Sequence, residues 1–107
     1  MRNITIEVAN AFRNGKYFSR GNTKVTVEGN IIKMLLHGNC IAQRTPLAMT
    51  ITNCGWFTPT TKERLNGLRG VDIVQKKGKW YLNGKEWDGE NTIIGAFGIW
   101  IDGNSYL

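Results

Sequence analysis

The dipeptide Asn83-Gly84 constrains the fold of this chain more than any other feature of its sequence. Asn-Gly between strand-forming residues is the strongest short-range signal of a β-hairpin closed by a two-residue type I′ turn. Such a turn fixes the register, so Trp80 on the first strand lies opposite Trp87 on the second. Because opposite residues point to the same side of a ribbon, the two indoles are predicted to pack against each other.

A second hairpin is predicted at Gly29-Asn30, where a segment that alternates polar and β-branched residues turns into an apolar one. Pairing across this turn places Val25 opposite Met34 on an apolar face. Lys24 and Lys33 then lie on the other, mostly polar face, as expected for a half-buried antiparallel sheet.

The same pattern continues through two more turns. A loop at residues 37–40 places Arg44 beside Lys33 on the polar face of the sheet. A three-residue loop at residues 45–47 is then required to keep the apolar side chains of the next strand inside. Residues 23–53 are therefore predicted to form a four-stranded meander.

Signals for helices are sparse. Thr58 before Pro59 is typical of a helix start, and Gly67 of a left-handed helix end, which predicts a helix over residues 59–66. A second short helix is predicted over residues 8–15.

Length and composition indicate one small domain. A chain of 107 residues with 41% hydrophobic and 21% charged residues has room for a single core. With a second meander at residues 71–88, the predicted fold class is α+β, with two antiparallel meanders and one or two short helices. The domain spans residues 1–107, with its core at about 10–89 and a C-terminal extension at 90–107. Most tryptophans are assigned to the core, Trp56 among them, and only Trp100 to the surface.

The chain is basic, with 14 Lys and Arg against 8 Asp and Glu, a net charge of +6 and a pI of about 9.6. Such a balance favours acidic partners such as nucleic acid, nucleotides or an acidic protein surface. Many small soluble proteins carry a similar charge without any anionic ligand, so this alternative stays open.

No targeting or membrane signal is recognised. The N-terminal residues lack the apolar core of a signal peptide, and the longest apolar run, residues 93–101, is too short to span a bilayer. A cytoplasmic protein is expected, and its cysteines, Cys40 and Cys54, are expected to be reduced.

Two long motifs resemble a group of small, uncharacterised proteins of tailed bacteriophages. They are GWFTPTTKERLN at residues 55–66 and WYLNGKEWDG at residues 80–89, and residues 21–25 and 36–42 also fit. The resemblance covers roughly residues 10–89. It implies a viral accessory protein made in the cytoplasm of an infected bacterium, and it brings no catalytic residues with it.

The residues favour a protein that is not an enzyme. His37 is the only histidine and flanks a predicted turn, and its predicted neighbour Cys40 has no third group to orient the pair. The acidic residues are scattered without the clustering of a metal site. No cofactor or metal is therefore expected.

Basic side chains on the two predicted sheet faces offer the better functional hypothesis. Lysines interleaved with an aromatic residue can hold phosphates and stack a base, whereas a solvated lysine-rich face would carry no ligand. The candidate ligand-binding residues are Lys24, Lys33, Arg44, Lys76, Lys79 and Tyr81.

Two function classes remain. The first is a binding protein for an anionic ligand, either nucleic acid or a nucleotide, used by a phage in host takeover or against host defence. The second is an inhibitor or adaptor that binds a host protein, or a second copy of itself, through the apolar segment at residues 93–101.

Overall fold

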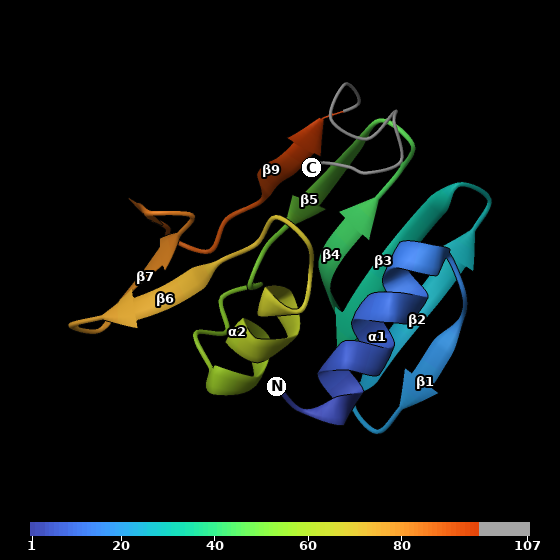
Figure 1. The fold of residues 1–107 in the computed structure, drawn as a ribbon, viewed down its shortest axis with the longest axis horizontal. Coiled ribbons are helices and arrows are strands. Elements are labelled where there is room, and N and C mark those ends of the chain that lie inside the picture. The colour runs from blue at the N-terminus through green and yellow to red at the C-terminus, as the bar shows by residue number, and fades with distance from the viewer. Residues whose placement is uncertain (97–107) are drawn as a thin grey trace.

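The computed structural model describes residues 1–96 and shows an α+β domain with two helices and two antiparallel sheets (Figure 1). The first sheet has six strands in the order β1-β2-β3-β4-β5-β9, and the second has three in the order β6-β7-β8. Helix α1 lies across one face of the six-stranded sheet, and the β6–β7 ribbon extends away from it (Figure 1). The elements are α1 (Asn3–Asn14), β1 (Phe18–Arg20), β2 (Thr23–Glu28), β3 (Ile31–Leu36), β4 (Asn39–Arg44), β5 (Ala48–Ile51), α2 (Pro59–Asn66), β6 (Ile73–Lys76), β7 (Lys79–Leu82), β8 (Lys85–Glu86) and β9 (Thr92–Ala96).

The hairpin at Asn83-Gly84 is confirmed. Both turn residues have positive φ, 51° and 90°, as a type I′ turn requires. The Trp87 N–H donates to the Trp80 carbonyl at 2.9 Å, and the two indoles stack with their ring centroids 6.2 Å apart. The register predicted from the sequence for this hairpin is therefore correct.

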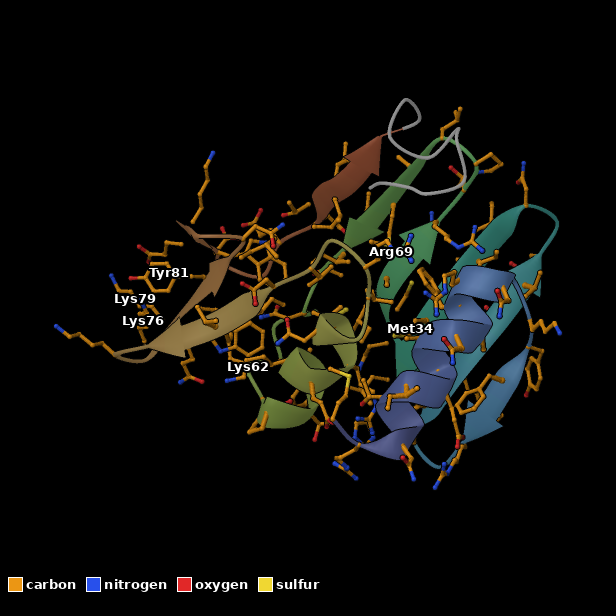
Figure 2. All side chains as sticks on the ribbon, viewed as in Figure 1. Met34, Lys62, Arg69, Lys76, Lys79 and Tyr81 are labelled. Carbon is orange, nitrogen blue, oxygen red and sulfur yellow. The ribbon has the colours of Figure 1, made fainter. Side chains whose placement is uncertain are left out.

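The β2–β3 hairpin also has the predicted register, with Val25 opposite Met34 and Glu28 opposite Ile31. Met34 and Val25 are fully buried beneath α1, whose Val8 is fully buried in the same core. Figure 2 shows Met34 under this helix.

The predicted register between β3 and β4 is wrong. The hairpin turns tightly at His37-Gly38, so Leu36 pairs with Asn39, and a β-bulge shifts the ladder between Met34 and Leu35. Ile41 is the extra residue of the bulge. The bulge changes which side chains of β4 face inward.

Two consequences follow from this bulge. Arg44 lies opposite Ile32 on the inner face, so it is not beside Lys33 on the outer face as predicted. The β4–β5 connection pairs Arg44 with Met49, which corresponds to a two-residue turn and not the required three-residue loop. Met49 still faces inward, with 2% of its surface exposed, because the bulge had already reversed the alternation.

Helix α2 has the predicted bounds. The Thr58 side chain accepts a hydrogen bond from the Thr61 N–H, and Pro59 opens the helix. The left-handed end at Gly67 is wrong, because its φ is −74°. A Cβ on Gly67 would lie 2.7 Å from the Thr5 methyl carbon, so glycine is needed there for the close approach of α1.

Helix α1 begins at Asn3, five residues before the predicted start, and ends at the left-handed Gly15 as expected. Its N-terminal half is tied to α2 through the buried Arg64, which is 2% exposed. The Arg64 guanidinium donates to the Thr5 and Thr23 hydroxyls at 2.8 and 3.2 Å and pairs with Glu63 at 3.3 Å. A buried charge needs such partners.

The segment expected to be a C-terminal extension contributes an edge strand. Strand β9 pairs antiparallel with β5 and leaves Ile93 66% exposed. The rest of the 93–101 segment, including Trp100, lies outside the described residues. Trp56 is 57% exposed, so its assignment to the core was wrong. Neither helix within residues 1–96 has the length and apolar character needed to cross a membrane.

Candidate functional site

The six candidate residues separate into three places. Lys24 and Lys33 lie on the face of the six-stranded sheet opposite α1. Arg44 lies on the inner face, where its Nε–H donates to the Phe12 carbonyl at 2.9 Å. Lys76, Lys79 and Tyr81 lie together on the β6–β7 ribbon (Figure 2).

The ribbon brings together the largest group of predicted residues. Lys76 and Lys79 are a directly opposed pair, and Tyr81 is paired with Val74 on the same face. Lys79 also lies 3.5 Å from the Glu86 carboxylate in an exposed ion pair. Such a pair is weak in water, so a stronger anion can displace it.

Two further lysines belong to this ribbon and were missed in the sequence. Lys77 occupies the turn between β6 and β7 with a φ of 52°, and Lys85 begins β8. Both are exposed. Lys77 was missed because only strand positions were considered for the ligand, and Lys85 because its pairing with Leu82 places it on the face opposite Lys79 and Tyr81. We call Lys76, Lys77, Lys79 and Lys85 the ribbon lysines.

Charge is concentrated on this element. Residues 73–86 contain the four ribbon lysines and one acidic residue, Glu86, which gives a local net charge of +3. Lys76 and Lys79 lie near the outer end of the β6–β7 ribbon, which extends away from the six-stranded sheet, so the field that they create is directed into solvent (Figure 2).

The opposite face of the ribbon fixes it to the body of the protein. Trp80 is 2% exposed and packs edge-to-face on Phe57 with ring centroids 5.1 Å apart. The Asn66 amide at the end of α2 bonds both backbone groups of Ile73, at 2.7 and 3.0 Å. The ribbon lysines are therefore carried on an anchored element.

The pair His37 and Cys40 has partners other than each other. The His37 ring lies 3.2 Å from the Asn22 amide nitrogen, and the Cys40 thiol donates to the Ala42 carbonyl at 3.3 Å. Burial raises the pKa of the Cys40 thiol, although nearby Lys33 opposes this shift. Both observations favour the protonated thiol over a nucleophilic thiolate.

Comparison with known protein families gives a match. The family described as Kyanoviridae Gp96 protein matches residues 1–105, a longer span than the resemblance seen in the motifs. No curated protein matches the chain, and no solved structure matches it. A match over nearly the whole sequence shows the family, and the chain belongs to the Kyanoviridae Gp96 proteins, a family of tailed-phage proteins.

Proposed function

We propose that this protein is a phage accessory protein that binds nucleic acid through the ribbon lysines and Tyr81. The observation that carries the proposal is the local charge of +3 on an anchored, solvent-directed ribbon. The proposed setting is the infected bacterium, in host takeover or against host defence.

The chemistry of the ribbon suits a single-stranded nucleic acid. Lysine ammonium groups neutralise phosphates and release condensed counterions, which supplies affinity without sequence preference. Tyr81 is half-buried on the same face as Lys79, so part of its ring is available for stacking on a base. Stacking of this kind contributes about 1–3 kcal/mol per base.

Fluorescence anisotropy with a labelled single-stranded DNA of mixed sequence tests the proposal. The double variant Lys76→Glu and Lys79→Glu is expected to weaken binding and to make the slope of log affinity against log salt shallower by about one unit per lost phosphate contact. The matched control is Lys24→Glu with Lys33→Glu, because it changes the net charge equally on the six-stranded sheet.

The result decides between local recognition and general charge. Loss of affinity in the ribbon variant alone supports the proposal. Equal loss in both variants, or no loss in either, refutes it.

Binding of a host protein by the apolar C-terminal segment is the second candidate. It is favoured by the exposed Ile93 on β9, which is the edge strand of the described sheet. An unpaired strand edge can accept a strand from a partner. Such capture would persist at high salt and after both charge reversals, and it would be lost in Ile93→Lys.

A further inference from the structure

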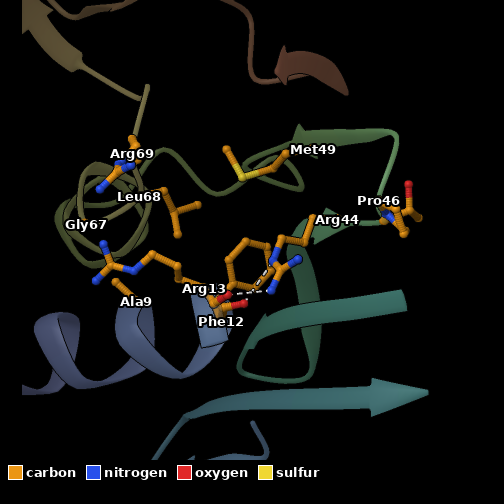
Figure 3. A pocket seen from close by; sticks show the side chains of 10 residues that line it. Ala9, Phe12, Arg13, Arg44, Pro46, Met49, Gly67, Leu68 and Arg69 are labelled. Atoms are coloured by element: carbon orange, nitrogen blue, oxygen red, sulfur yellow. Dashed lines mark hydrogen bonds between the residues drawn. The ribbon is translucent and has the colours of Figure 1, made fainter. Parts of the chain in front are cut away.

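A cavity of about 390 Å³ lies between the C-terminal half of α1, the residues that follow α2, and the β4–β5 turn (Figure 3). Pockets for small molecules range from about 300 to 1,000 Å³, so this one suits a compact ligand. It is separate from the ribbon, because Figure 2 places Arg69 at its rim well away from Lys76 and Lys79.

The inner wall of the cavity is apolar. Phe12 from α1 and Met49 from β5 are each 2% exposed, and Leu68 from the segment after α2 is 6% exposed, so tightly packed side chains form this wall. An aromatic ring and a thioether are good partners for a flat, polarisable group such as a nucleobase.

Arginines surround this apolar wall. Arg13 from α1, Arg44 from β4 and Arg69 from the segment after α2 all line the cavity (Figure 3). None of the described residues that line it is acidic. Arg13 also donates to the side-chain oxygen of Asn10. Guanidinium groups bind phosphate well, because their N–H groups match its oxygens in a bidentate geometry.

Arg44 is held in a fixed orientation. Its Nε–H and Nη2 donate to the Phe12 and Arg13 carbonyls at 2.9 and 2.6 Å, and its guanidinium lies 5.7 Å from the centroid of the Phe12 ring. These two bonds use two of the five N–H groups of a guanidinium. Burial lowers the pKa of Arg44 from its ordinary value, yet arginine stays charged in proteins.

We propose that this cavity binds a nucleoside monophosphate, with the phosphate held by Arg13, Arg44 and Arg69 and the base against Phe12, Met49 and Leu68. The arginines suit the phosphate dianion, and the apolar wall suits the base, so each half of the ligand has its own part of the site. The proposal does not depend on the ribbon, so each can fail without the other.

Isothermal titration calorimetry with each of the four common ribonucleoside 5′-monophosphates tests the site, with adenosine and inorganic phosphate as half-ligand probes. At least one monophosphate is expected to bind with a dissociation constant below about 1 mM, and each half-ligand at least about tenfold more weakly. Absence of binding by all four, or equal binding of inorganic phosphate, overturns the proposal.

Variants locate the binding. Arg13→Gln and Arg69→Gln change exposed residues, and each is expected to weaken the monophosphate about tenfold while the melting temperature stays near that of the unmodified protein. Lys76→Gln is the matched control, because it also removes one positive charge, and it should leave monophosphate affinity unchanged. Loss in the control variant, with no loss in the arginine variants, would assign the binding to the ribbon and refute the cavity.

Discussion

Arg44→Ala is expected to destabilise the protein, because the guanidinium closes the C-terminal end of α1. The last four carbonyls of a helix have no partner within the helix. Arg44 donates to two of them, those of Phe12 and Arg13. A cation at this end also interacts favourably with the helix dipole.

The size of the effect follows from three contacts. A typical hydrogen bond is worth about 1 kcal/mol, a value that suits a half-buried donor, and Arg44 makes two of them to carbonyls. The helix end adds about 0.3–1 kcal/mol, and the contact with the Phe12 ring adds about 0.5–1 kcal/mol. Because these contributions overlap, we expect the free energy of unfolding to fall by about 2–3 kcal/mol.

Equilibrium unfolding in urea, followed by tryptophan fluorescence, measures this change. At an m-value of about 1–3 kcal/mol/M, the midpoint should fall by about 1 M or more with the slope unchanged. Lys33→Ala is the matched control on the opposite sheet face and should change stability by less than about 0.5 kcal/mol. If Arg44→Ala unfolds at the same midpoint as Lys33→Ala, the carbonyl bonds contribute nothing and the reasoning fails.

Three other substitutions test the packing and the charge network. Trp80→Ala should lower the free energy of unfolding by about 3–5 kcal/mol, because it removes an indole that is 2% exposed. Unfolding in urea at the wild-type midpoint would contradict this burial. The Arg2 backbone N–H is the main cause of a pKa of Glu63 below its ordinary 4.5. The stabilisation that the ionised Glu63 provides is complete above about pH 4.5 and is lost as the pH falls through the lowered pKa. In Glu63→Gln, the free energy of unfolding should therefore depend less on pH in the acid range. Gly89→Ala should cost at least about 2 kcal/mol by thermal melting, because φ is +88° and a Cβ would collide with the buried Asn53 amide, whereas a tolerated alanine would show that this loop rearranges freely.

The turns of this fold could be predicted from the sequence because their cause is local. At Asn83-Gly84 and Lys77-Gly78, the required positive φ values depend on two residues and not on distant contacts. The cap of α2 at Thr58 is local in the same way. Placement of Lys76, Lys79 and Tyr81 on one face followed directly from these turns and the two-residue period of a strand.

The bulge in β4 could not be predicted, because alternation alone does not reveal an inserted residue. The segment from Asn39 to Arg44 has small and polar residues on both sides, so either register gives an acceptable pattern. The observed register is favoured by a tertiary contact, because it places Arg44 where it donates to the Phe12 and Arg13 carbonyls of α1.

The exposure of Trp56 has a local cause, in the hydrogen bonds of the loop that precedes it. Residue type favours burial of tryptophan, yet the chain between β5 and α2 buries Asn53 instead and holds Gly55 through the Asn53 side chain at 2.8 Å. Asn53 in this polar turn is buried, and the Trp56 indole that follows it is 57% exposed. Side-chain hydropathy is a weak guide wherever a loop must satisfy its own backbone groups.

The net charge of +6 does not describe one uniform surface. Arg64 and Arg44 use their guanidinium groups on hydroxyls and carbonyls inside the protein, so they contribute to the formal charge but bind internal partners. Residues 73–86 alone hold a net +3, half of the formal total. Charge-reversal variants of this protein must therefore be matched by position as well as by number. A charge change at an internal arginine alters the stability of the fold, whereas the same change at a ribbon lysine alters the electric field outside the protein.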